Sequence, residues 1–153
     1  MRTGREAAGL AAALVAAAEL AACGGGGGGH KGPTPAQDRA AVRGTLVKLE
    51  RATAAHDYAT MCNQVLAREL IARVAGAGLP CQTALKLGLR GVRQPHLQVT
   101  TIKVSGNRAL AQVYSAAKGQ RAATDVVQLV RERGAWRVAS LAGPQPPAPP
   151  RAA

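Results

Sequence analysis

Apolar side chains recur at helical spacing over about residues 35–56 of the chain. Val42, Leu46 and Leu49 fall on one face of a helix, whereas charged residues such as Arg39 and Arg43 fall on the opposite face. This pattern predicts a long amphipathic helix whose apolar face packs against another layer of the protein.

The sequence Thr34-Pro35-Ala36-Gln37 predicts where this helix begins. It offers a capping threonine, a proline at the first helical position, and a glutamine three residues after the cap, which together form a capping box. Inside the helix, Gly44 costs about 1 kcal/mol relative to alanine. Close packing against the backbone of Gly44 is the expected reason for its presence.

Shorter helices are expected next. Asp57 can cap a helix that contains Cys62, and the apolar pattern then resumes until Gly76 ends it. Pro80 follows at the start of a further helix over about residues 80–91, which carries Cys81.

From residue 96 the period changes from helical to alternating and β-branched residues become frequent, which indicates strands. Turn residues divide this region into strands over about 97–104, 108–117, 121–132 and 135–141, and the short spacings suit antiparallel hairpins. Alternation predicts that six side chains face a core: Ile102, Val104, Val127, Leu129, Trp136 and Val138. The proline-rich residues 143–153 cannot join a sheet and are expected to form an exposed tail. Helices followed by a four-stranded antiparallel sheet define an α+β fold.

The N-terminus has the layout of a lipoprotein signal peptide. Residues 1–22 begin with Arg2 and Arg5, continue through an apolar stretch, and end at Leu20-Ala21-Ala22-Cys23. This tetrapeptide resembles the lipobox of bacterial lipoproteins, in which the cysteine becomes the acylated first residue of the mature chain. Residues 23–33, with a glycine run at 24–29, then form a flexible tether. We expect a lipid anchor at Cys23 that holds the protein to the cell membrane on its extracytoplasmic face; a cleaved signal without lipid is the alternative.

The other two cysteines, Cys62 and Cys81, form an even pair in a compartment that is expected to be oxidising. We predict a disulfide between them, which would stabilise the fold by about 3 kcal/mol in the chain-entropy model. Two buried free thiols are one alternative. A metal site is the other, although no nearby histidine completes the usual zinc-ligand spacing.

Charge and composition narrow the choice of partners. The 153 residues include 20 Lys and Arg against 8 Asp and Glu, for a formal net charge of +12, and only 2% are aromatic. Dispersed basic residues without interleaved aromatics support only nonspecific electrostatics, so no specific nucleic-acid partner is expected. The cationic surface can instead contact anionic lipid or a cell-wall polymer, with each basic residue near a membrane contributing about 1 kcal/mol.

The order of elements over about residues 35–142 resembles the cone-shaped, cystatin-like domains of the nuclear transport factor 2-like superfamily. The resemblance is carried by His56-Asp57-Tyr58 before Cys62 and by Gly134-Ala135-Trp136-Arg137-Val138 in the last strand. It implies a single domain at residues 34–142 in which N-terminal helices pack on a curved four-stranded antiparallel sheet. Because this scaffold hosts enzymes, binding modules and assembly domains, the resemblance does not fix a function.

Cone domains of this kind can open a pocket between sheet and helices, and the ketosteroid isomerase-like and polyketide cyclase-like enzymes among them use a buried acid with a tyrosine or histidine. Asp125 is the sharpest candidate because it has the same strand parity as Val127; the alternative is an exposed acid paired with Arg108 or Arg121. The sequence holds no paired acids, Ser/His/Asp order, phosphate loop or metal-spaced cluster, so no catalytic residue, metal or cofactor is assigned. The candidate pocket residues are Tyr58, Tyr114, Asp125 and Trp136.

These features predict a non-catalytic binding or interaction module of the cell envelope, which takes a small apolar ligand, an envelope component or a partner protein. The alternatives are a small pocket enzyme of isomerase or cyclase type and an assembly module that forms a homodimer through its sheet. Burial of Asp125 beside Tyr114 or a histidine, in a pocket of roughly 300 Å³ or more, would favour the enzyme. An exposed apolar sheet face would favour assembly.

Overall fold

The computed structural model describes residues 32–142. The signal peptide, Cys23, almost all of the glycine-rich tether and the proline-rich tail were predicted for residues 1–31 and 143–153, which lie outside the described part. Within it, the elements run α1 (Pro35–Ala54), α2 (Tyr58–Thr60), η1 (Met61–Val65), α3 (Arg68–Gly76), α4 (Cys81–Gly88), β1 (His96–Ser105), β2 (Arg108–Ala116), β3 (Ala123–Glu132) and β4 (Ala135–Ala142).

Helix α1 begins where the sequence predicts. The side chain of Thr34 accepts a hydrogen bond from the Gln37 backbone N–H, and the Gln37 side chain accepts one from the Thr34 N–H at 2.7 Å, which completes the capping box. Val42 and Leu46 are fully buried, as expected of the apolar face. The prediction for Gly44 is wrong: a Cβ at this position would meet nothing within 4 Å, so close packing does not explain the glycine.

The second apolar run is divided between two helical segments. After the single α-turn of α2, the chain widens into the π-helical η1 and then becomes extended at Leu66. Leu66 forms an isolated parallel bridge with Val138, and the N–H of Ala67 donates to the Val138 carbonyl at 2.8 Å. The backbone at residues 66–67 therefore pairs with β4, and α3 begins only afterwards.

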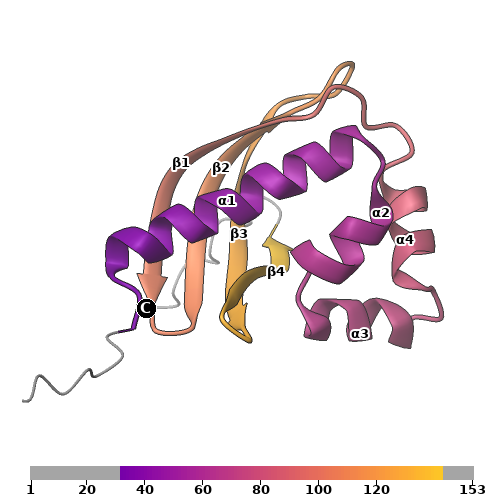
Figure 1. The fold of residues 1–153 in the computed structure, drawn as a ribbon. Coiled ribbons are helices and arrows are strands. Elements are labelled where there is room, and N and C mark those ends of the chain that lie inside the picture. The colour runs from indigo at the N-terminus through magenta and orange to yellow at the C-terminus, as the bar shows by residue number, and fades with distance from the viewer. Residues whose placement is uncertain (1–31, 143–153) are drawn as a thin grey trace, which may run out of the picture. The chain divides into compact units, whose positions relative to one another are not determined.

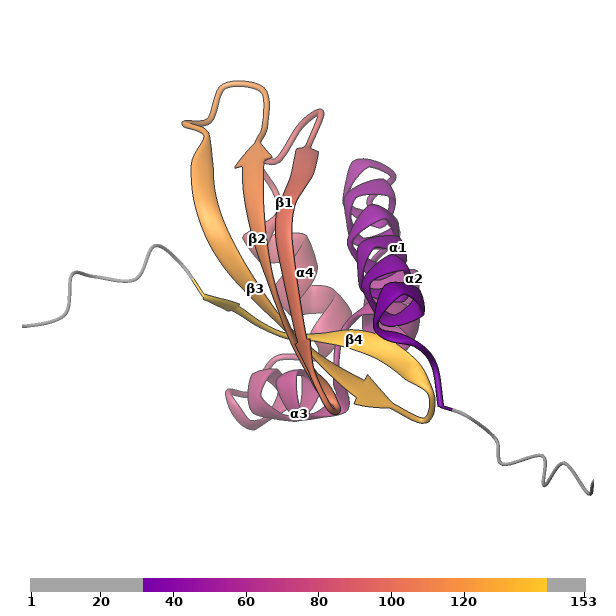
Figure 2. The same ribbon diagram turned by 90° about the vertical axis from the view of Figure 1, so that its left-hand side faces the viewer.

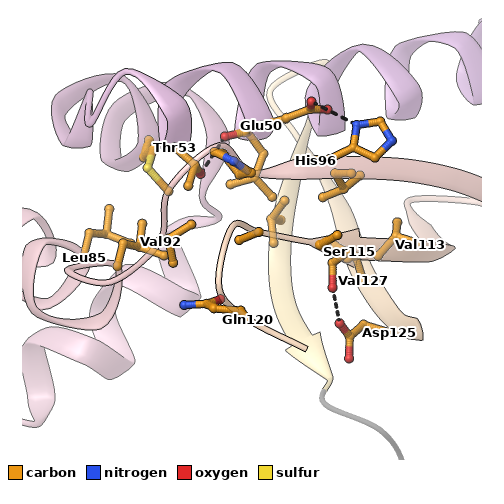
Figure 3. Close-up of a pocket in the computed structure, with 18 of the residues that line it drawn as sticks. Glu50, Thr53, Leu85, Val92, His96, Val113, Ser115, Gln120, Asp125 and Val127 are labelled. Carbon is orange, nitrogen blue, oxygen red and sulfur yellow. Dashed lines mark hydrogen bonds and ion pairs between the residues drawn. The ribbon is translucent and has the colours of Figure 1, made fainter. Parts of the chain in front are cut away.

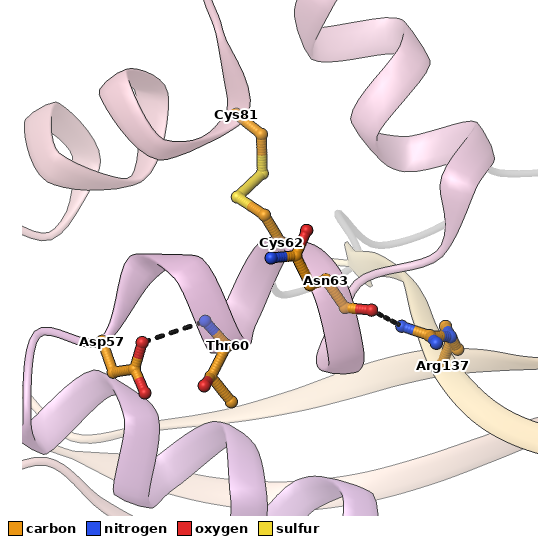
Figure 4. The surroundings of a disulfide bond; sticks show 6 residues. All are labelled: Asp57, Thr60, Cys62, Asn63, Cys81 and Arg137. Carbon is orange, nitrogen blue, oxygen red and sulfur yellow. Dashed lines mark hydrogen bonds between the residues drawn. A yellow bond between two sulfur atoms is a disulfide. The ribbon is translucent and has the colours of Figure 1, made fainter.

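Asp57 caps α2 as predicted. Its carboxylate accepts a hydrogen bond from the Thr60 backbone N–H at 2.9 Å (Figure 4). Hydrogen bonding from the side chain and then the backbone of Thr60 holds the pKa of the Asp57 carboxyl below its ordinary value. The cap therefore keeps its stabilising charge at mildly acidic pH, and loses it only as the pH falls through that lowered pKa.

The four strands form one antiparallel sheet in the order β1-β2-β3-β4, joined by successive hairpins. Figures 1 and 2 show α1 lying along one face of this sheet, with α2 and α4 near the C-terminal end of α1 and α3 beside β4. Alternation places the inner side chains as predicted: Val127, Leu129, Trp136 and Val138 are buried, and Ile102 and Val104 pack against the same core in half-buried positions. The predicted α+β architecture is confirmed.

The predicted disulfide is present and joins Cys62 of η1 to Cys81 of α4, with the two Cα atoms 6.1 Å apart (Figure 4). Next to it, the Arg137 side chain on β4 donates to the Asn63 carbonyl at 2.6 Å. Neither α3 nor α4 has a fully buried residue. The disulfide therefore supplies a covalent connection for a region with little core of its own.

A buried ion pair connects the N-terminal half of α1 to the C-terminal end of β3. Asp38 on α1 pairs with Arg131 of β3, and their side chains are only 12% and 18% exposed. The Trp136 indole N–H also points to Asp38 at 3.4 Å, and the Arg131 guanidinium carbon lies 4.7 Å from the centroid of the Trp136 ring. Helix, third strand and fourth strand thus meet in one polar cluster inside an otherwise apolar layer.

Candidate ligand cavity

A cavity of about 420 Å³ lies between the inner face of the sheet, the C-terminal half of α1, and the segment from α4 to β1 (Figure 3). Most of its lining is aliphatic. The apolar residues that contribute include Leu49, Met61, Leu85, Leu89, Val92, Leu97, Val113 and Val127.

Side-chain size explains why this space is left open. The inner residues of β2 end in Val113 and Ser115, and Ala116 and Ala117 follow along the rim. The chain contains no phenylalanine, two tyrosines and one tryptophan, and none of those three aromatic side chains lines the cavity. Small residues at the end of the sheet therefore face helical segments that contribute leucine and methionine but no aromatic side chain to fill the gap.

One polar pair lies on the sheet side of the cavity. The Ser115 hydroxyl donates a hydrogen bond to Asp125 Oδ2 at 2.9 Å, and both residues are half-buried. The β2–β3 register produces this contact, because Val113 is paired with Asp125 and Ser115 with Ala123, so that Ser115 and Asp125 are diagonal neighbours on one face.

A second polar pair lies on the helix side. His96 Nδ1 at the start of β1 is 3.8 Å from Glu50 Oε1 on α1, with side-chain exposures of 64% and 27%. This distance is longer than a hydrogen bond, so the two groups interact through charge only when His96 is protonated. Thr53 also lines the cavity, but its hydroxyl already donates to the Leu49 carbonyl at 2.8 Å.

The four predicted pocket residues do not form one site. Asp125 lines the cavity, whereas Tyr114 is on the opposite face of the sheet and is 41% exposed. Trp136 is buried in the polar cluster with Asp38, and the Tyr58 hydroxyl lies 3.2 Å from His56 Nδ1 beyond the end of α1. The error for Tyr114 follows from strand parity, since it is adjacent to the inward-facing Val113 and Ser115.

The alternative partners expected for Asp125 are also not observed. Arg108 pairs across the sheet with Val130, far along β2 from Val113, which pairs with Asp125. Arg121 lines the rim of the cavity, but within residues 32–142 no ion pair joins it to Asp125. The observed partner, Ser115, was not among the predicted residues, and only the hairpin register would have revealed it.

Two further features are absent from the described residues. Between residues 32 and 142 there is no group of three or more His, Cys, Asp or Glu side chains arranged to hold a metal ion. In the same part of the chain, no helix is both long and apolar enough to cross a membrane.

Comparison with known proteins identifies the fold. The sequence matches no protein-family model and no curated protein. Among solved structures, an NTF2-like protein of unknown function from Shewanella baltica OS155 is similar with a TM-score of 0.54 at 15% identity, over 71% of this chain and 94% of that one. An NTF2-like protein of unknown function from Burkholderia xenovorans LB400 is similar with a TM-score of 0.44 at 18% identity, over 72% and 90% of the two chains. The helices packed on a four-stranded antiparallel sheet, together with the first of these similarities, show that the chain has an NTF2-like fold.

Proposed function

We propose that this protein is a membrane-anchored extracytoplasmic lipoprotein whose NTF2-like domain binds a small apolar ligand. The observation that carries the binding function is the cavity of about 420 Å³ with its largely aliphatic lining. Its volume lies within the range of roughly 300–1,000 Å³ that is typical of small-molecule sites.

The chemistry of the lining supports binding of an apolar molecule. A ligand that covers half-buried residues such as Leu85, Leu89 and Leu97 would remove their apolar surface from water, at about 25 cal/mol for each Å². The few polar groups, among them Ser115 and Asp125, are placed to orient the ligand rather than to enclose it.

Two features support the extracytoplasmic location. The Leu20-Ala21-Ala22-Cys23 motif supports acylation of Cys23, and two acyl chains give stable membrane attachment. The Cys62–Cys81 disulfide is the kind of bond that persists in oxidising compartments. The formal net charge of +12 supports an additional contact with anionic lipid or a cell-wall polymer.

A pocket enzyme of isomerase or cyclase type is a weaker candidate. Asp125 is half-buried in the cavity, but within the described residues its hydrogen-bond partner is the Ser115 hydroxyl. Tyr114 faces away, and His96, the one described histidine that lines the cavity, lies beside Glu50. The enzyme hypothesis requires a tyrosine or histidine beside Asp125, and within residues 32–142 neither hydrogen-bonds to it.

An assembly module that dimerises through the sheet is the second candidate. Leu110, Val126 and Tyr114 are 48%, 38% and 41% exposed on the outer face of the sheet. The β2–β3 register makes Val126 a diagonal neighbour of both Leu110 and Tyr114, so the three side chains are contiguous. This exposed apolar strip favours a partner on the outer face. Because the cavity is on the inner face, binding of such a partner is compatible with binding of a ligand in the cavity.

Filling the cavity tests the binding function. Ala117→Leu adds bulk to a half-buried residue of the rim, so we expect it to weaken binding of the neutral apolar fluorophore N-phenyl-1-naphthylamine about fivefold or more. The measurement is a fluorescence titration of the full chain with its disulfide intact. Ala75→Leu is the matched control, because Ala75 is exposed on α3 outside the cavity. Failure of the unmodified protein to bind the fluorophore, or equal weakening by both variants, would contradict the proposal.

A further inference from the structure

We infer that the cavity selects an apolar ligand with a positively charged head group, such as a primary amine, and that Asp125 is the main anchor for that group. The inference rests on the proposed function, because it presupposes that the cavity binds a ligand. It goes further by giving the chemical class of that ligand.

The acidic side chains within residues 32–142 differ in whether they have a partner. Three of the six are paired with arginine: Asp38 with Arg131, Glu69 with Arg73 at 2.8 Å, and Glu132 with Arg137 at 4.0 Å. Asp57 caps α2. The remaining two, Glu50 and Asp125, have neither a cap nor a lysine or arginine partner in the described part of the chain, and both line the cavity.

The lack of a lysine or arginine partner at Glu50 and Asp125 is notable because basic residues are abundant in this chain. With 20 lysines and arginines in the chain, an acid at an arbitrary surface position has many opportunities for pairing. A carboxylate that is half-buried without a cationic partner has lost part of its hydration without a matching charge. A ligand ammonium group would supply that charge and form a charge-assisted hydrogen bond.

Figure 3 shows how the two acids are placed: Glu50 and His96 lie beside α1, and Ser115 and Asp125 lie across the cavity on the sheet. Glu50 has a histidine 3.8 Å away that neutralises it when protonated. Among the described residues, Asp125 has only the neutral Ser115 hydroxyl as a partner, which donates to Oδ2 and leaves Oδ1 as an acceptor. Asp125 is therefore the stronger of the two cation sites, with the aliphatic lining next to it for the body of the ligand.

Two positive features oppose a cationic ligand, but neither outweighs a direct contact. The net charge of +12 is spread over the whole chain, and its repulsion is screened beyond about 8 Å at physiological ionic strength. Arg121 lies exposed at the rim, where its charge is solvated. The carboxylate of an anionic ligand would have to bind Arg121 at the exposed rim. Its head group would then lie outside the half-buried region around Asp125.

Three ligands with the same chain and different head groups test this inference: octylamine, octanol and octanoate. Titration of the full chain with its disulfide intact, followed by NMR, is expected to show octylamine binding about fivefold more tightly than octanol, with octanoate weakest. This ratio is smaller than that of a fully buried charged hydrogen bond, because Asp125 is half-exposed. Asp125→Asn is expected to remove the preference for octylamine while changing octanol affinity less than about twofold. Glu69→Gln removes the same charge from an exposed position outside the cavity and is expected to leave all three affinities unchanged.

The outcomes separate this inference from the proposed function. Equal binding of all three ligands, tightest binding of octanoate, or an amine preference that survives Asp125→Asn would overturn the head-group assignment while leaving an apolar binding site in place. Absence of binding by every ligand would overturn both. A loss of octylamine affinity in Glu69→Gln as large as in Asp125→Asn would show that net charge, not Asp125, sets the preference.

Discussion

Asp38→Ala is expected to lower the free energy of unfolding by about 3 kcal/mol, because it leaves the Arg131 guanidinium without its partner in a site where that side chain is only 18% exposed. The Trp136 N–H loses an acceptor in the same step. In the described part of the chain, Arg131 Nε is already buried without a hydrogen-bond partner, so loss of Asp38 also removes the carboxylate to which this guanidinium donates.

Urea unfolding followed by fluorescence measures this effect, because Trp136 is the single tryptophan of the chain and is 4% exposed. Circular dichroism on the same samples separates unfolding from a direct change in indole emission. Glu69→Ala is the matched control: it breaks another carboxylate–arginine pair, whose side chains are 53% and 79% exposed, and about 0.5 kcal/mol or less is expected. Equal losses for the two variants would show that the Asp38–Arg131 pair is no more important than a surface contact.

The apolar double variant Asp38→Leu with Arg131→Met sharpens this test. It removes both charges together, so no uncompensated ion remains, and it is expected to be more stable than Asp38→Ala alone. A double variant less stable than the single one would show that the unpaired Arg131 charge is not the source of the loss in Asp38→Ala.

Replacing Cys62 and Cys81 together with serine is expected to lower the free energy of unfolding by about 3 kcal/mol. The bond spans 19 residues, and a closed loop of this length restricts the unfolded chain by about that amount. The segment inside the loop includes α3, which has no fully buried residue, and the bond is attached to the first residue of α4. Loss of the bond should therefore loosen α4 before the rest of the domain.

Urea unfolding of the oxidised protein and of the double variant gives the global effect, and amide hydrogen exchange gives the local one. Amides of α4 are expected to exchange faster in the variant, whereas those of β2 and β3 keep their protection until global unfolding. Because Leu85 and Leu89 of this region line the cavity, weaker binding of the apolar fluorophore should accompany the change. A loss below about 1 kcal/mol, with α4 protection unchanged, would show that packing alone holds this segment.

Local features of the fold were predictable from sequence because the interactions that produce them are close along the chain. The capping box of Thr34 and Gln37, the Asp57 cap and the hairpins of the sheet each depend on residues a few positions apart. Alternation then assigned Val127 and Val138 to the core correctly. The same rule, applied strictly, would also have placed Tyr114 on the outer face.

Features that depend on distant residues were not predictable in the same way. The pair of Asp38 and Arg131 joins positions 93 residues apart, and nothing near either residue distinguishes it from a solvated surface charge. The break before α3 arises from pairing of Leu66 with Val138. The contact of Ser115 with Asp125 requires the β2–β3 register, and the unfilled volume of the cavity depends on side chains from helix and sheet together.

The proposed function places this domain outside the cytoplasm through Cys23, and the intact mass of the protein extracted from membranes tests that placement most directly. The expected result is a chain that begins at Cys23, carries a covalently bound lipid, and contains an oxidised Cys62–Cys81 pair. The Cys23→Ser variant should lack the lipid and leave the membrane fraction. Recovery of that variant with membranes at the full unprocessed mass would contradict the account.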